Sequence, residues 1–148
     1  MNWPLVAGVG SHFGDDCAGW RMVQRLEQLG YPSDRLQCVR HPSALLDCMR
    51  PAETLIVCDA CQGSGVAGSI HHWRWPNPIF RTLSFPGTHE MGLKDVLDLA
   101  DVLQIRPRQV DIWAIEGAGW NMVAATPAMI TLAAAAAAED IWSFVTHA

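Results

Sequence analysis

Short apolar runs alternate with amphipathic segments along this chain, and this alternation constrains the fold more than any other feature. The runs at 4–9, 54–59 and 110–115 have the length of strands and carry at most one charged residue each, as expected for strands that are buried on both faces. Segments 18–29 and 93–103 repeat apolar residues at helical spacing. Buried strands that alternate with such helices predict an α/β fold, with a mostly parallel sheet covered by helices on both faces.

The remaining segments complete a predicted sheet of about five strands, one of them antiparallel. Residues 36–39 and 69–75 are the two further strands, and the second is placed near an edge because prolines follow it. A short helix is expected to begin at Pro42, since proline suits the first helical turn. Thr126 is predicted to cap the last helix and Pro127 to begin it.

Composition excludes several classes of function. A net charge of −5 leaves no basic surface for nucleic acid. The N-terminal residues lack the basic start of a signal peptide, and the uninterrupted apolar runs fall well short of a membrane span. Five scattered cysteines without an export signal indicate reduced thiols and a cytoplasmic location. No linker or repeat divides the chain, so we expect one domain over residues 1–148, without a membrane or nucleic-acid partner.

The loop after the first predicted strand carries two acids at a place where a nucleotide-binding loop would receive phosphate. Its sequence GVGSHFGDD ends in Asp15 and Asp16, and Phe13 stands where the dinucleotide fingerprint needs its third glycine. Two carboxylates at a helix N-terminus repel phosphate and attract a cation. We interpret Asp15 as the helix cap, whereas Asp16, one residue past the cap at a strand's carboxyl end, is a candidate functional residue.

Asp59 closes the second apolar run and is the next candidate. An acid at the end of a buried strand is costly unless it is paired, hydrogen-bonded or bound to a metal. If the first and second apolar runs are adjacent strands, Asp59 lies close to Asp16. The alternative is that Asp59 only forms a turn ahead of Gly63.

Cys58 and Cys61 form a C-x-x-C pair that fits neither a redox motif nor a zinc site. Cys58 falls inside the predicted strand, and the residues after Cys61 do not begin a helix. A zinc knuckle would need a second pair of cysteines, and the sequence has none. We therefore interpret both as buried or half-buried structural thiols.

His89 is the third candidate, in the segment PGTHEMGL just before a predicted helix. Histidine is the commonest side chain for metal ligation and for proton transfer near neutral pH, and two carboxylates with one imidazole suit a divalent ion such as nickel or zinc. A loop histidine can equally be a plain surface residue. Among the other histidines, His71 and His72 point to opposite faces of their predicted strand and make a poor joint chelate.

These segments resemble the motifs of the nickel–iron hydrogenase maturation endopeptidases. The matching pieces are GVG…GDD…G over residues 8–19, VCDA over 57–60 followed by Gly63, and THEMGL over 88–93, with a weaker match in IEG at 115–117. Their order and spacing fit over nearly the whole chain. The first motif combined with the His-x-x-Gly-Leu segment is fairly specific, whereas each piece alone would be weak.

The resemblance implies a three-layer αβα sandwich with a twisted, mostly parallel sheet. It implies an endopeptidase that removes the C-terminal extension of a nickel–iron hydrogenase large-subunit precursor after nickel insertion. The catalytic and metal-contacting groups of that family fall on Asp16, Asp59 and His89. The nickel would be contributed by the substrate, so we expect no tightly held cofactor, and we expect a monomer.

Some residues depart from the pattern of that family. Ser11 stands where asparagine is usual, Cys17 and Ala114 stand where glycine is usual, and Gly117 stands where proline is common. None of these changes removes a proposed ligand. Cys17 adds a soft ligand beside Asp16, which puts the details of the substrate in question more than the class of reaction.

Several alternatives stay open from the sequence. Hydrolysis can be metal-assisted, with a free carboxylate or His89 as the general base, or it can use Asp16 and Asp59 as an aspartic-type dyad, which leaves His89 without a role. A non-enzymatic nickel-binding maturation factor and a nucleotide-binding module are the competing classes. The tryptophans near predicted loops or edges either line a peptide groove or pack in the core; they are Trp20, Trp73, Trp75 and Trp120.

Overall fold

The apolar runs of the sequence lie side by side in the middle of one sheet. The computed structural model describes residues 2–12, 14–63, 65–85, 91–117 and 128–147, with the backbone alone for residues 14 and 15. The strands and α-helices are β1 (Leu5–Val9), α1 (Ala18–Leu29), β2 (Leu36–Val39), β3 (Thr54–Cys61), β4 (Ile70–Trp75), α2 (Leu93–Val102), β5 (Gln109–Glu116) and α3 (Ala128–Thr146). The short 3-10 helices are η1 (Gly14–Cys17), η2 (Ser33–Arg35), η3 (Pro42–Cys48) and η4 (Pro78–Arg81).

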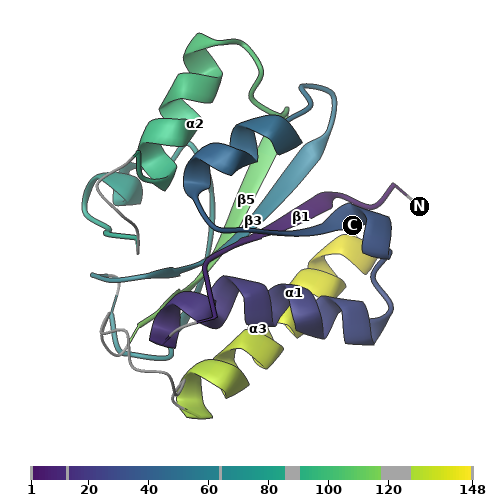
Figure 1. The fold of residues 1–148 in the computed structure, drawn as a ribbon, viewed down its shortest axis with the longest axis vertical. Coiled ribbons are helices and arrows are strands. Elements are labelled where there is room, and N and C mark those ends of the chain that lie inside the picture. The colour runs from purple at the N-terminus through teal and green to yellow at the C-terminus, as the bar shows by residue number, and fades with distance from the viewer. Residues whose placement is uncertain (1, 13, 64, 86–90, 118–127, 148) are drawn as a thin grey trace.

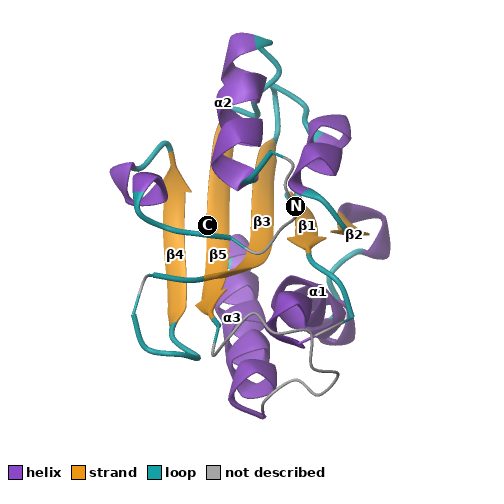
Figure 2. Ribbon diagram, turned by 60° about the vertical axis from the view of Figure 1, so that its left-hand side comes forward, coloured by secondary structure: helices purple, strands orange, loops and turns teal. Residues whose placement is uncertain are grey.

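The sheet has five strands in the order β2-β1-β3-β5-β4, and β3 is its central strand. β1, β2, β3 and β5 are parallel to one another, and β4 pairs antiparallel with β5 at the edge, as Figure 2 shows. The predicted α/β class, the five strands, the antiparallel strand and the edge position of the 69–75 segment are all confirmed. β5 reaches its place beside β3 through α2, which crosses one face of the sheet.

Helices cover both faces of the sheet, as Figure 1 shows. We call the side packed against α1 and α3 the α3 face, and the side packed against α2 and η3 the α2 face. Along β3, Ile56 and Cys58 belong to the core on the α3 face, whereas Leu55 and Val57 belong to the core on the α2 face. This alternation explains why the central strands are apolar throughout, since both of their faces are buried.

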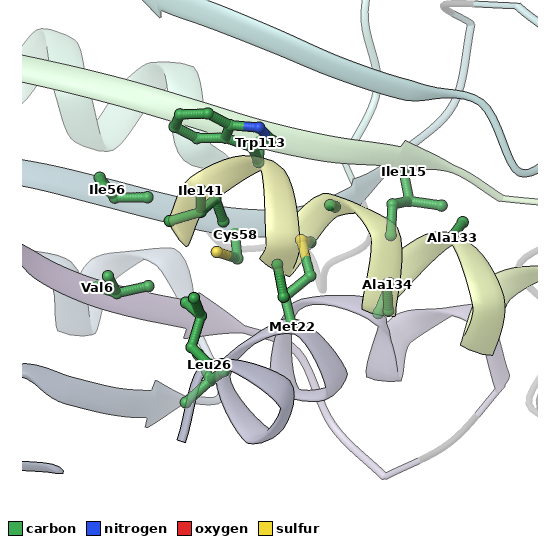
Figure 3. Packing of buried hydrophobic residues seen from close by; sticks show 14 of the residues in the cluster. Val6, Met22, Leu26, Ile56, Cys58, Trp113, Ile115, Ala133, Ala134 and Ile141 are labelled. Carbon is green, nitrogen blue, oxygen red and sulfur yellow. The ribbon is translucent and has the colours of Figure 1, made fainter. Parts of the chain in front are cut away.

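The core on the α3 face is formed by α1 and α3 closing over β3 and β5. Figure 3 shows its side chains, among them Val6, Met22, Leu26, Ile56, Cys58, Trp113, Ile115, Ala133, Ala134 and Ile141. Small side chains in the alanine run of α3 let this helix approach α1 closely, and the two helices are in extensive contact. The alanine run of α3, residues 133–138, is therefore part of a closely packed helix pair.

Most element boundaries match the sequence expectations, and the differences have physical reasons. The helix over 18–29 is confirmed at both ends, because Gly30 adopts a left-handed backbone (φ 101°) that ends it. β3 extends two residues past Asp59 to Cys61, since its pairing with β5 continues that far. The predicted start of the last helix at Thr126 and Pro127 lies outside the described residues.

α3 is long and apolar enough to cross a membrane, by length and composition only. The uninterrupted apolar runs considered from the sequence are shorter, because Glu139 and Asp140 interrupt the apolar residues of this helix. Core helices of globular proteins reach the same length and hydropathy. Residues of α3 at helical spacing are buried in the core on the α3 face, including Ile130, Ala134 and Ile141.

Candidate active site

Asp59 lies on β3 near the edge of the sheet where the carboxyl ends of β1, β3 and β5 meet. Ligands of open α/β sheets bind beyond this edge. Asp59 pairs in register with Ala114 of β5 and alternates with Cys58, so it falls on the α2 face together with Leu55 and Val57. The central strand of the sheet therefore places a carboxyl group within the core, just inside the expected ligand edge.

The carboxyl group of Asp59 is wholly buried and only half satisfied. The backbone N–H of Ala60 donates a hydrogen bond of 2.8 Å to its Oδ1, whereas Oδ2 is buried with no hydrogen-bond partner among the described residues. Burial raises the pKa of Asp59 well above its usual value; the Ala60 bond opposes this, and the negative charge of Asp16 adds to it. Burial therefore favours the protonated form of this carboxyl group.

Asp16 is held beside Asp59 by the turn that follows β1. The backbone N–H of Ser11 donates a hydrogen bond of 3.1 Å to the carbonyl oxygen of Asp16, which closes the loop between β1 and η1. A Cβ atom at Gly10 would overlap that same carbonyl oxygen, so the second glycine of the motif is required for the close approach. The Asp16 side chain is partly exposed. Its charge acts on the pKa of Asp59, as expected if β1 and β3 are adjacent strands, and the register shows that they are.

The prediction that Asp15 caps the helix is wrong. α1 begins at Ala18, and its N-cap is Cys17, because the 3-10 turn η1 stands between the loop and the helix. Asp16 accordingly precedes the N-cap by one residue, whereas the sequence predicts it one residue after the cap. Its position at the carboxyl end of β1 is unaffected by this change.

The glycines around the first loop serve helix–sheet packing. A Cβ atom at Gly8 would overlap the carbonyl oxygen of Gly19, and a Cβ atom at Gly19 would overlap the carbonyl oxygens of Val9 and Cys58. α1 thus rests directly on the backbones of β1 and β3. In a phosphate-binding loop, the backbone N–H groups face the anion, but here the N–H of Ser11 is directed at a carbonyl oxygen of its own loop.

The expectations for His89, and for Trp120 as a groove residue, concern positions outside the described residues. His89 lies four positions before Leu93, the first residue of α2. Its assignment to the site therefore stays a prediction. Within the described part of the chain, no group of three or more His, Cys, Asp or Glu side chains is arranged to hold a metal ion.

Cys58 and Cys61 are both fully buried, as the sequence predicted. Cys58 faces the α3 core, and burial raises the pKa of its thiol far above the usual value, with smaller contributions from Asp59 and Cys38. Cys61 lies at the end of β3, where its Sγ is 3.5 Å from Oε2 of Glu116. Glu116 Oε1 also accepts a hydrogen bond of 2.9 Å from the N–H of Gly63, so Glu116 anchors the loop that follows β3.

Two of the tryptophans considered for a peptide groove are core residues. Trp20 and Trp75 are buried, and the Nε1–H of Trp20 donates a hydrogen bond of 3.0 Å to the carbonyl oxygen of Val39. Trp73 is partly buried and packs against the core on the α2 face. Core packing, one of the two interpretations left open, therefore accounts for these three.

Sequence reasoning did not identify two polar positions on β4 and β5. His71 of β4 lies on the α2 face, opposite Ala114, and its Nε2 is buried without a hydrogen-bond partner among the described residues. Asp111 of β5 is wholly buried on the α3 face. Asp111 could have been noticed as an acid that interrupts an apolar run. His71 could have been noticed from the prediction that His71 and His72 point to opposite faces, which the register confirms.

Comparison with known proteins shows the same fold in solved structures of hydrogenase maturation proteases. The hydrogenase maturating endopeptidase HybD from E. coli superposes with a TM-score of 0.79 at 23% identity, covering 99% of this chain and 93% of that one. The [NiFe] hydrogenase maturation protease HybD from Thermococcus kodakarensis gives 0.75 at 18% identity, over 98% and 99% of the two chains. HycI from Thermococcus kodakarensis gives 0.74 at 20% identity, over 98% and 93%. No family model and no curated protein matches the sequence.

Proposed function

We propose that this protein is an endopeptidase that removes a C-terminal extension from the large-subunit precursor of a nickel–iron hydrogenase. Asp16, Asp59 and His89 are its proposed site residues. The observation that carries the proposal is the buried Asp59 Oδ2, an oxygen without a partner among the described residues, beside Asp16 at the ligand edge of the sheet. The shared fold with proteins named hydrogenase maturation proteases and the sequence motifs support the same function.

Asp59 is suited to a site that a cation enters as part of the bound substrate. Burial favours the protonated form of Asp59, whereas a divalent cation beside a carboxyl group favours the carboxylate and releases the proton. Recognition of the precursor's nickel by Asp16, Asp59 and His89 would therefore couple arrival of nickel to ionisation of Asp59. A precursor without nickel would leave Asp59 protonated, and cleavage would therefore depend on prior nickel insertion.

The partly exposed Asp16 and the buried Asp59 also differ enough in environment to divide acid and base roles. Peptide hydrolysis needs a group that takes a proton from water and a group that gives one to the leaving nitrogen. The proposal needs no resident cofactor, since the cation belongs to the precursor. We place the reaction in the cytoplasm, with the protein acting as a monomer.

The test is to mix the purified protein with nickel-loaded and nickel-free large-subunit precursor and to follow the precursor mass by mass spectrometry. We expect the nickel-loaded precursor to lose a C-terminal peptide and the nickel-free precursor to stay intact. Asp16→Asn and His89→Ala should each abolish this shortening while their circular dichroism spectra match that of the parent protein.

Other outcomes would redirect the proposal. Shortening of both precursors at the same rate would remove nickel recognition from it. Tight binding of nickel by the free protein, together with an intact precursor, would contradict the peptidase and indicate a nickel-binding maturation factor. Normal cleavage by His89→Ala would remove His89 from the site.

A further inference from the structure

His71 occupies an unusual position for a histidine on an edge strand. Its ring stacks on Trp73, the next residue on the same face of β4, with ring centroids 4.9 Å apart and ring planes 5° apart. Trp73 in turn packs edge-on against Phe80, at 5.7 Å between centroids. The imidazole is therefore held in one orientation by aromatic packing, and its Nε2 is buried in that orientation.

The strand register places His71 and Asp59 in the same row of the sheet. Ala114 of β5 pairs with His71 of β4 on one side and with Asp59 of β3 on the other. All three side chains fall on the α2 face, because they alternate with residues of the core on the α3 face. Two strand spacings separate the Cα atoms of His71 and Asp59, which is about 10 Å. Ala114 contributes only a methyl group to the row, so no long side chain of β5 stands between the imidazole and the carboxyl group.

The two side chains share a second property. Among the described residues, the buried side-chain polar atoms without a hydrogen-bond partner are Asp59 Oδ2 and His71 Nε2. A buried polar atom without a partner destabilises the folded state, so natural structures rarely retain one without a ligand or a buried water. Two such atoms in one row, on one face of the sheet, indicate a single partner that satisfies both.

We propose that His71 is a positioning residue of the active site, which holds Asp59 through one buried water molecule bonded to both Asp59 Oδ2 and His71 Nε2. A buried water typically makes two to four hydrogen bonds, roughly three on average, and these two atoms supply the first two. The water fixes the rotation of the Asp59 carboxyl group, and the Trp73 stack fixes the imidazole. The role of His71 in hydrolysis rests on the proposed function, whereas the link between His71 and Asp59 does not.

The link can be tested without any substrate by measuring the ring ¹⁵N chemical shifts of the histidines by NMR. Asp59→Asn should change the shift of His71 Nε2 and leave those of His72 unchanged. The matched control is Asp111→Asn, which replaces the other fully buried aspartate of the sheet and should move His72, its hydrogen-bond partner at 2.8 Å, but not His71. A His71 Nε2 shift that is indifferent to Asp59→Asn would overturn the proposal.

The functional role is tested with three variants in the precursor assay. His71→Phe keeps a ring to stack on Trp73 but has no polar atom, and we expect its kcat to fall by about tenfold to a hundredfold with KM unchanged, as for loss of a group that orients a ligand. His71→Gln carries an amide near the position of Nε2 and should recover part of the loss. His72→Gln changes the neighbouring residue, which faces the opposite side of the sheet, and should cleave at the parent rate.

Stability distinguishes positioning from a structural role. His71→Phe keeps the ring that stacks on Trp73 and gives up only the bond to the water, so its melting temperature should stay close to that of the parent protein. Parent-like kcat in His71→Phe would overturn the positioning role. If the parent protein itself leaves every precursor intact, the proposed function fails, and the NMR comparison still decides whether His71 and Asp59 are linked.

Discussion

Two aspartates are wholly buried in the same sheet, and the structure treats them in opposite ways. Asp111, on the α3 face, accepts hydrogen bonds from the Nε2 of Gln109 at 2.7 Å, the Nε2 of His72 at 2.8 Å and the Nε of Arg74 at 3.3 Å. Asp59, on the α2 face, has one backbone hydrogen bond and an oxygen with no partner among the described residues.

The pKa values of the two carboxyl groups move in opposite directions for this reason. Burial alone would raise the pKa of Asp111, but the hydrogen bonds from His72 and Gln109 and the charge of Arg74 outweigh burial and lower it. For Asp59, burial dominates and raises the pKa. Asp111 is thus an internal part of the scaffold, whereas Asp59 keeps one carboxyl oxygen without a protein partner among the described residues, at a cost in stability.

The strongest test of the difference between Asp59 and Asp111 is to make the same conservative change at both aspartates. Asp59→Asn should slow cleavage of nickel-loaded precursor by about 10²–10⁴-fold, the usual loss when a group that handles protons or charge is removed. Asp111→Asn should cleave at the parent rate per folded molecule. The assay is the mass of the precursor over time, and equal losses in both variants would contradict the separation of roles.

A second change should affect stability and leave activity intact. Asp111→Ala removes the acceptor of three hydrogen bonds, and we expect the free energy of unfolding to fall by about 2 kcal/mol. The loss is moderate because Arg74 and His72 are partly exposed and can turn to water. Denaturation in urea measures it, with Asp59→Ala as the matched variant, which should lose less.

The pH dependence of stability should have opposite signs for the two aspartates. The raised pKa of Asp59 means that the folded protein loses stability as pH rises from the unfolded value of 3.8 through the folded-state pKa. Asp59→Asn should therefore have a higher melting temperature than the parent protein at neutral pH, and the difference should close as the pH falls toward 3.8.

Asp111→Asn should show the reverse. The lowered pKa of Asp111 gives stability that is present above the unfolded value of 3.8 and is lost as pH falls through the folded-state pKa. This variant should melt below the parent at neutral pH, and the two should converge in strong acid. Melting curves from about pH 3 to 8 cover the range in which acid unfolding reports on carboxyl groups. Gaps of the same sign for both variants would refute the contrast.

The smallest effect is expected at the residue next to Asp59. Cys58 points into the core on the α3 face, so Cys58→Ala should cost only about 1 kcal/mol of stability for the lost packing. Cleavage of the precursor should continue at the parent rate. A large loss of activity in this variant would mean that the C-x-x-C pair has a chemical role that its burial argues against.

The sequence predicted the scaffold well because the scaffold depends on local patterns. Apolar runs predicted the strands, the prolines after Trp75 predicted the edge strand, and helical spacing predicted the extent of α1. These features need no knowledge of register between distant strands. The sequence left the adjacency of β1 and β3 as a condition, and the register shows it and brings Asp16 toward Asp59.

The rest depends on register and could not be derived. His71 joins the row of Asp59 only because β4 runs antiparallel and pairs His71 with Ala114; a shift of one residue would send it to the other face. Likewise, the partners of Asp111 come from β4 and from its own strand once the register is fixed. The cap of α1 was misplaced because a 3-10 turn uses the same polar residues as a helix start.

The contact at Gly19 has a consequence for how such a protein can diversify. Not even one methyl group fits between the first turn of α1 and the carbonyl oxygens of Val9 and Cys58, so any larger residue at Gly19 would force α1 away from the segments that carry Asp16 and Asp59. Related proteins with this fold can therefore vary their outer loops to bind a different substrate protein, while the spacing between Asp16 and Asp59 stays the same.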